Sequence, residues 1–102
     1  MIYRLDYSDG FTSTLDEHLT YLNEAGVSRF TIDRWFEKLL AFTESLSEWP
    51  ERFPVDHVLT MATGRETRKA NFGRYLISYR VNDDDRTVTL LGFVHGSMRR
   101  ER

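Results

Sequence analysis

One histidine and three arginines in the second half of this 102-residue chain are the side chains best suited to chemistry. His95 can take up and release a proton near neutral pH. Arg68, Arg74 and Arg80 can each hold a phosphate through paired hydrogen bonds. Cleavage of RNA without a metal needs such a base, an acid and cations around the phosphate. His95 can equally be structural, bonded to a backbone carbonyl, or lie at an interface.

Other kinds of site find little support in the sequence. The chain has no cysteine, which excludes a disulfide scaffold, a thiolate zinc site and a cysteine nucleophile. The histidines His18, His57 and His95 lack metal-ligand spacing, and His18 is expected to face solvent on a helix. The consecutive carboxylates Asp83–Asp85 are typical of a solvated turn. No serine lies in a nucleophile elbow. Taken together, these observations lead us to expect no metal and no cofactor.

The charge is divided unevenly along the chain. Residues 1–51 carry 4 basic and 10 acidic side chains, a net charge of −6, whereas residues 52–102 carry 10 and 6, a net charge of +4. Such a division predicts two electrostatic faces. A pI of about 5.9 and only two lysines argue against a phosphate-rich target such as the ribosome. No apolar run approaches the ~20 residues that span a bilayer, so no membrane partner is expected.

Hydrophobic periodicity predicts the elements that must position these groups. Residues 2–8 alternate as a strand, residues 11–24 carry a helical stripe that ends near Gly26, and residues 29–48 form a longer helix. Residues 75–81 and 88–95 read as strands around a turn of Asn and Asp, with a polar strand expected at residues 66–72. The chain is therefore expected to be one α+β domain over residues 1–102, an antiparallel sheet packed against an N-terminal helical hairpin.

The last strand is apolar on both faces. Alternation predicts a core face of Val88, Leu90 and Val94, with Leu91, Phe93 and His95 pointing the other way. An exposed pair such as Leu91 and Phe93 is typical of a surface that binds a partner.

Residues 73–98 resemble a known family. A strand rich in arginine and tyrosine ends in Tyr79-Arg80-Val81, an acidic turn follows, and the last strand ends in Val94-His95-Gly96. This pattern resembles the C-terminal half of the RelE/ParE superfamily, the bacterial toxins of type II toxin–antitoxin systems. The ending His-Gly-Ser-Met is more similar to the ParE branch.

The resemblance implies a cytoplasmic toxin that forms a hetero-oligomer with a cognate antitoxin and binds no specific DNA sequence itself. In the ParE branch the toxin inhibits DNA gyrase without catalysing a reaction. A RelE-like, ribosome-dependent mRNA endonuclease that uses His95, Arg68, Arg74 and Arg80 is the alternative. A non-toxic protein of the same fold, active only in binding, is the third.

The same resemblance suggests two functional surfaces. The toxicity face would comprise Arg68, Arg74, His95, Met98, Arg99 and Arg100. The antitoxin would bind Leu91, Phe93, Leu19 and Leu22, docking an amphipathic helix in a groove. The acidic first half favours basic residues near that segment of the partner.

Overall fold

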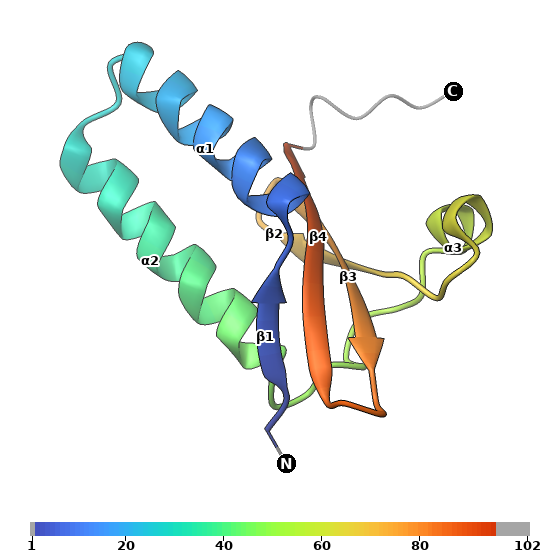
Figure 1. Cartoon of the computed structure of the whole chain (residues 1–102). Coiled ribbons are helices and arrows are strands. Elements are labelled where there is room, and N and C mark those ends of the chain that lie inside the picture. Colours follow the sequence, from blue (N-terminus) through green and yellow to red (C-terminus); the bar gives the residue numbers. More distant parts are fainter. Residues whose placement is uncertain (1, 96–102) are drawn as a thin grey trace.

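The structure is a computed structural model that describes residues 2–95 of the chain. A sheet carries two long helices on one face and a short helix on the other (Figure 1). The elements in chain order are β1 (Arg4–Tyr7), α1 (Asp9–Glu24), α2 (Arg29–Ser45), α3 (His57–Thr63), β2 (Arg68–Phe72), β3 (Tyr75–Asn82) and β4 (Thr87–His95). The predicted α+β architecture is confirmed.

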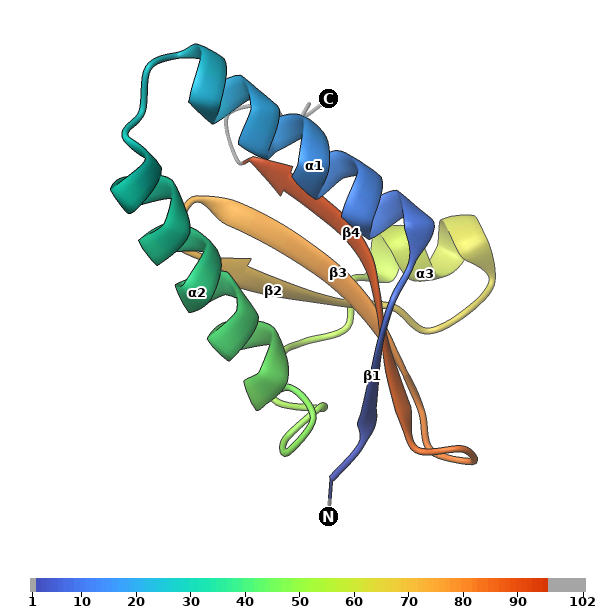
Figure 2. The ribbon, with the colours of Figure 1, turned by 60° about the vertical axis from the view of Figure 1, so that its left-hand side comes forward.

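Both long helices begin at a serine. The Ser8 hydroxyl accepts a hydrogen bond from the Phe11 N–H, and Ser28 does the same for Thr31, which satisfies one free amide at each helix start. Gly26 adopts a φ of 85° just beyond α1, a left-handed conformation that glycine takes without a steric penalty. The two helices diverge from their connecting loop, so that α1 lies along β4 while α2 spreads towards β2 (Figure 2).

The sheet has the order β1-β4-β3-β2. β2, β3 and β4 pair antiparallel as predicted, but β1 runs parallel to β4, so the sheet is mixed. The alternation of apolar residues in β1 predicted which of its faces is buried, and that face is indeed the one that packs against the core. Alternation carries no information about strand direction, which the pairing partner decides.

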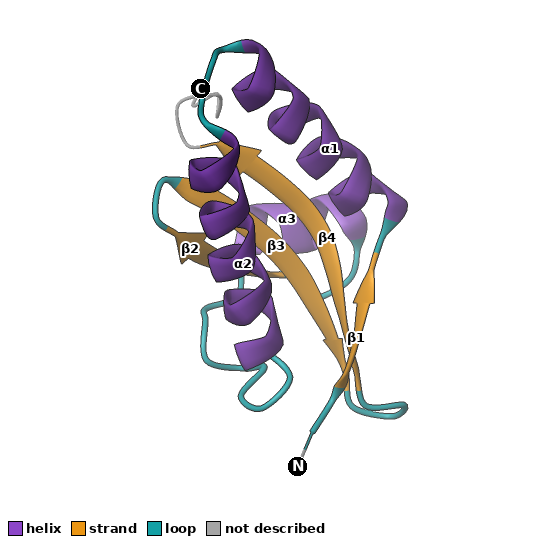
Figure 3. Cartoon of the chain, turned by 90° about the vertical axis from the view of Figure 1, so that its left-hand side faces the viewer, coloured by secondary structure: helices purple, strands orange, loops and turns teal. Residues whose placement is uncertain are grey.

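The hydrophobic core fills the space between the helical hairpin and the sheet (Figure 3). Its buried members come from every long element and are Phe11, Leu39, Leu46, Ala70, Ile77, Tyr79, Val88, Leu90 and Phe93. Tyr79 is fully buried there, and its hydroxyl donates a 2.6 Å hydrogen bond to the carbonyl of Pro50. The turn that ends the helical hairpin is thereby tied to the central strand.

A β-bulge in β4 overturns the predicted faces of that strand. Ser78 pairs with Gly92, but the next residue of β3 pairs with Leu90, which leaves Leu91 without an opposite residue. Beyond the bulge the alternation is inverted. Phe93 is 1% exposed in the core, and Val94 is 39% exposed on the other face, so the prediction was wrong for both.

The segment between α2 and β2 contains a helix that the sequence did not predict. The Asp56 carboxylate accepts hydrogen bonds from the Val58 and Leu59 amides and caps α3, which Gly64 ends in a left-handed conformation. α3 lies on the face of the sheet opposite the hairpin (Figures 1 and 3). The predicted polar strand exists, as β2, and begins at Arg68.

Candidate functional site

Two histidines and a tyrosine meet where α1 crosses the end of β4. His18 Nε2 lies 2.9 Å from the hydroxyl of Tyr75, a hydrogen-bond distance. The ring of His95 lies edge-on to Tyr75, with centroids 5.0 Å apart, and 6.2 Å from the ring of His18. The three groups come from α1, β3 and β4, so only the folded chain brings them together.

Aromatic rings enclose this trio. The ring centroid of Trp35 lies 5.5 Å from that of His18 and 5.2 Å from that of Tyr75. The ring of Phe93 stacks on Tyr75 with a centroid distance of 5.0 Å. Burial lowers the pKa of His18, and the nearby His95 lowers it further. Burial also raises the pKa of Tyr75. Both shifts favour the neutral, hydrogen-bonded form of the pair.

His18 does not face solvent as the sequence analysis expected. It follows Leu15 by three residues and precedes Leu22 by four, which places it on the apolar stripe of α1. That spacing was a readable signal for a partly buried histidine.

The arginines predicted to hold phosphate lie apart. Arg68 pairs with Tyr79 in the sheet and faces the helical hairpin, where its Nη1 donates a 2.6 Å hydrogen bond to the carbonyl of Phe53. Arg80 is the next residue after Tyr79 and points to the opposite face. Arg74 lies in the exposed turn between β2 and β3, at the same end of the sheet as His95. The four residues do not converge on one point.

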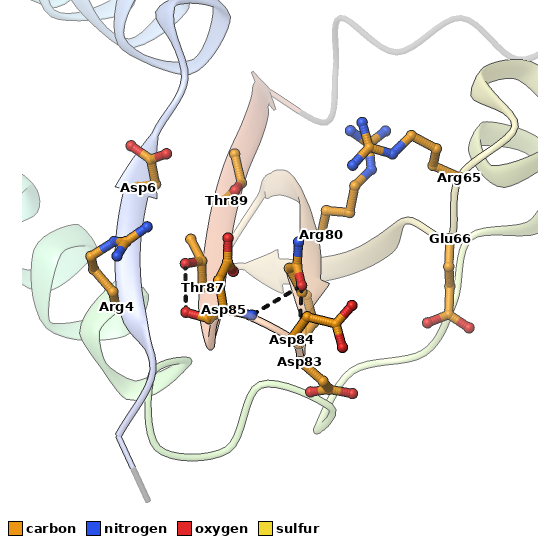
Figure 4. A pocket seen from close by; sticks show the side chains of 12 residues that line it. Arg4, Asp6, Arg65, Glu66, Arg80, Asp83, Asp84, Asp85, Thr87 and Thr89 are labelled. Atoms are coloured by element: carbon orange, nitrogen blue, oxygen red, sulfur yellow. Dashed lines mark hydrogen bonds between the residues drawn. The ribbon is translucent and has the colours of Figure 1, made fainter.

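Arg80 instead lies beside Arg65, a residue that the sequence analysis did not single out. Both line a hollow of about 500 Å³ on the face opposite the hairpin, and in Figure 4 their side chains extend toward one another. Burial, with the Arg65 charge in addition, lowers the pKa of Arg80. The other lining residues are Arg4, Asp6, Glu66, Val81, Asn82, Asp83, Asp84, Asp85, Thr87 and Thr89.

The acidic turn lines one side of this hollow (Figure 4). The backbone amides of Asp84 and Asp85 donate to the Asn82 side chain, and Asp83 accepts a 2.7 Å hydrogen bond from the Tyr3 hydroxyl. This confirms the predicted hairpin turn. Among residues 2–95, no three histidine or acidic side chains gather as metal ligands would.

A family model of the ParE toxin of the type II toxin–antitoxin system parDE matches residues 5–100. The chain belongs to the ParE toxin family. No curated protein sequence matches it. Within the described part of the chain, no helix is both long and apolar enough to cross a bilayer.

Two solved toxin–antitoxin structures share the fold of this ParE-family chain. One is the RelBE2 complex of Mycobacterium tuberculosis, 23% identical with a TM-score of 0.61, a match that covers 93% of this chain and 99% of the other. The second is the archaeal RelE–RelB complex of Pyrococcus horikoshii OT3, 21% identical with a TM-score of 0.57, covering 97% and 100%. At these identities the likeness concerns the fold.

The ParE-family chain has a second hollow, of about 390 Å³, between its two long helices. Leu19 of α1 and Phe36 of α2 supply apolar walls, and Arg29 and Asp33 supply charge. Leu22, also expected to bind the antitoxin, is partly buried in the same helix. Of the two expected residues on β4, Leu91 is partly buried at the bulge, but Phe93 is internal and cannot meet a docked partner.

Three residues of the predicted toxicity face, Met98, Arg99 and Arg100, lie outside the described residues. Of the rest, Arg74 is exposed, Arg68 is tied to backbone carbonyls and His95 belongs to the aromatic trio.

Proposed function

We propose that this chain is a cytoplasmic toxin that inhibits DNA gyrase by binding, and that a cognate antitoxin neutralises it. The observation that carries the choice of target is the placement of the arginines. Arg68 and Arg80 point to opposite faces of the sheet, so they cannot clamp the same phosphate. Inhibition by binding needs no such convergence.

A ribosome-dependent mRNA endonuclease is the second candidate. It is favoured by the trio of His18, Tyr75 and His95. The two imidazole groups of this trio can act in proton transfer, and they lie at the same end of the sheet as the exposed Arg74. The RelE folds of the two structural neighbours are in keeping with it.

One protein sample decides between the targets. We expect the purified chain to inhibit supercoiling by gyrase and to leave the mRNA of translating ribosomes intact. Site-specific mRNA cuts with normal supercoiling would establish the endonuclease instead. If expression without an antitoxin leaves growth unchanged, the protein is a binding module of the same fold.

Two variants connect the activity to residues. His95→Gln keeps a hydrogen-bonding side chain that cannot titrate, and we expect it to retain most of the toxicity. The double variant Arg99→Ala with Arg100→Ala should have reduced toxicity while it remains folded, because surface charges change stability by only about 0.5 kcal/mol. A folded His95→Gln protein without toxicity would support the endonuclease.

The hollow between α1 and α2 is the proposed docking site for the antitoxin. Its apolar walls and its position in the acidic half of the chain suit an amphipathic helix with basic residues at the rim.

A further inference from the structure

Arg65 and Arg80 stand next to each other without a counter-ion. Among residues 2–95, neither guanidinium forms an ion pair with a carboxylate, although five acidic side chains line the same hollow. Glu66 is the sequence neighbour of Arg65, yet it points away from both guanidinium groups (Figure 4). The positive charge of Arg65 acts on that of Arg80 and repels it, so the native fold keeps an unfavourable electrostatic interaction here.

The hydrogen-bonding capacity of Arg80 is only partly used. Its Nη2 donates to the hydroxyls of Thr67 and Thr63 at 3.3 and 3.5 Å, both long contacts. Its Nε is buried and has no partner in the described structure. A buried donor without an acceptor is costly. An anion bound to the guanidinium group of Arg80 would offset the repulsion from Arg65.

From this arrangement, we propose that Arg65 and Arg80 bind one carboxylate side chain of a protein partner, whose flanking basic residues meet the acidic rim. A carboxylate is the group that a pair of guanidinium forks binds most directly. The acidic rim includes the turn with Asp84 and Asp85, which would attract lysine or arginine on either side of the inserted acid.

The charge balance of the hollow favours such a peptide over a nucleic acid. Three arginines and five acidic residues line it, so its formal net charge is −2. A polyphosphate would bring many negative charges to the acidic rim, which would repel them. A single carboxylate between basic residues instead matches the arginine pair with its negative charge and the acidic rim with its positive ones. The site lies on the face opposite the hairpin hollow, so both can be occupied at once. The proposal does not depend on which target the toxin acts on.

Peptide titrations followed through the arginine Nε–Hε resonances test this site. The probe is the capped peptide acetyl-Lys-Glu-Lys-amide, and acetyl-Lys-Gln-Lys-amide is its uncharged match. We expect the Glu peptide to shift the Arg80 resonance in a saturable way, with an affinity about tenfold or more above that of the Gln peptide. Inorganic phosphate and a thymidine decanucleotide at equal ionic strength serve as the other arms.

Variants identify the residues responsible. Arg65→Gln should weaken binding of the Glu peptide about tenfold, and because Arg65 is exposed, the variant should still fold. Arg80→Gln should abolish binding. Arg34→Gln, which removes an exposed arginine from α2, should bind like the unchanged protein.

The proposal fails if the Glu and Gln peptides shift Arg80 equally, or if Arg65→Gln binds the Glu peptide unchanged. It also fails if the decanucleotide binds more tightly than the Glu peptide and shifts the same two arginines, because the site would then take nucleic acid.

Discussion

At the scale of single residues, polar side chains packed among apolar ones determine how the stability of this protein depends on pH and on substitution. His18 and Tyr75 bond to each other within a wall of aromatic rings, and Tyr79 bonds to Pro50 across the core. Each such bond satisfies a group that burial would otherwise penalise. Removing one partner therefore costs more than the bond itself is worth.

Stability should fall in mild acid because of His18. Its lowered pKa means that the unfolded chain takes up a proton first as the pH falls below about 6.5. The free energy of unfolding should then decrease with falling pH, and His18→Gln should flatten that dependence. His95 and Tyr75 face the same ring.

Urea denaturation at several pH values between about 5 and 7 measures this effect. His57→Gln, at an exposed position of α3, is the matched control and should keep the full dependence. A His18→Gln protein with an unchanged slope would show that His18 titrates as in the unfolded chain.

Tyr79→Phe should destabilise the fold by about 1–3 kcal/mol, since the buried carbonyl of Pro50 loses its donor. Tyr21→Phe removes the same hydroxyl from a side chain that is 64% exposed, and it should change stability by less than about 0.5 kcal/mol. Thermal denaturation of both variants makes the comparison. Equal losses would mean that the bond to Pro50 contributes nothing specific.

At the scale of elements, a β-bulge and a helix cap shape the face of the sheet that lies opposite the helical hairpin. The bulge at Leu91 exchanges the faces of the sheet that the later residues of β4 occupy. It coincides with Gly92, where a Cβ atom would lie 2.7 Å from the Ser78 Oγ. Across the same face, α3 depends on its Asp56 cap, because none of its residues is fully buried. Its Val58 and Met61 are 77% and 84% exposed.

Asp56→Ala should cost about 1 kcal/mol at neutral pH, because the variant loses the helix cap and the ion pair with Lys69 at 3.6 Å. Asp56→Asn should cost less, since asparagine also caps helices. The hydrogen bond from the Leu59 amide, the Val58 amide and Lys69 lower the pKa of Asp56, so its contribution is present above about pH 4 and is lost as the pH falls below that.

Both Asp56 variants should therefore approach the stability of the unchanged protein in acid. Denaturation at about pH 7 and pH 3 checks this, and a cost for Asp56→Ala that persists at low pH would contradict it.

At the scale of the whole molecule, the sheet separates two surfaces. The hairpin face holds the apolar hollow between α1 and α2, and the other face holds the arginine pair and α3 (Figures 1 and 4). A ParE-family toxin has to meet both an antitoxin and a target, and two separate surfaces allow both contacts. The bound antitoxin should also raise the apparent stability of the toxin by mass action.

Leu19→Asp should weaken binding of the cognate antitoxin at least tenfold, because it places a charge in the wall of the hairpin hollow. Val58→Asp puts the same charge on the opposite face and should leave the affinity unchanged. Calorimetric titration of both variants, after circular dichroism has established their folding, provides the measurement. Equal affinities would place the antitoxin elsewhere.

The sequence by itself determined the local features. The helical stripes of α1 and α2, the alternation in β1 and β3 and the turn after Asn82 all follow from side-chain spacing, which reports which face of an element is buried. The family resemblance in residues 73–98 likewise depended on adjacent residues, and the family match confirmed it.

The tertiary structure decided what depends on pairing between distant segments. The parallel direction of β1, the bulge that hides Phe93 and the apposition of His18 with Tyr75 all arise between elements far apart in the chain. Arg65 and Arg80 are 15 residues apart, in a turn and a strand that no periodicity connects. The physical reason is that spacing fixes only the face a residue occupies, whereas register and packing choose the neighbour it meets.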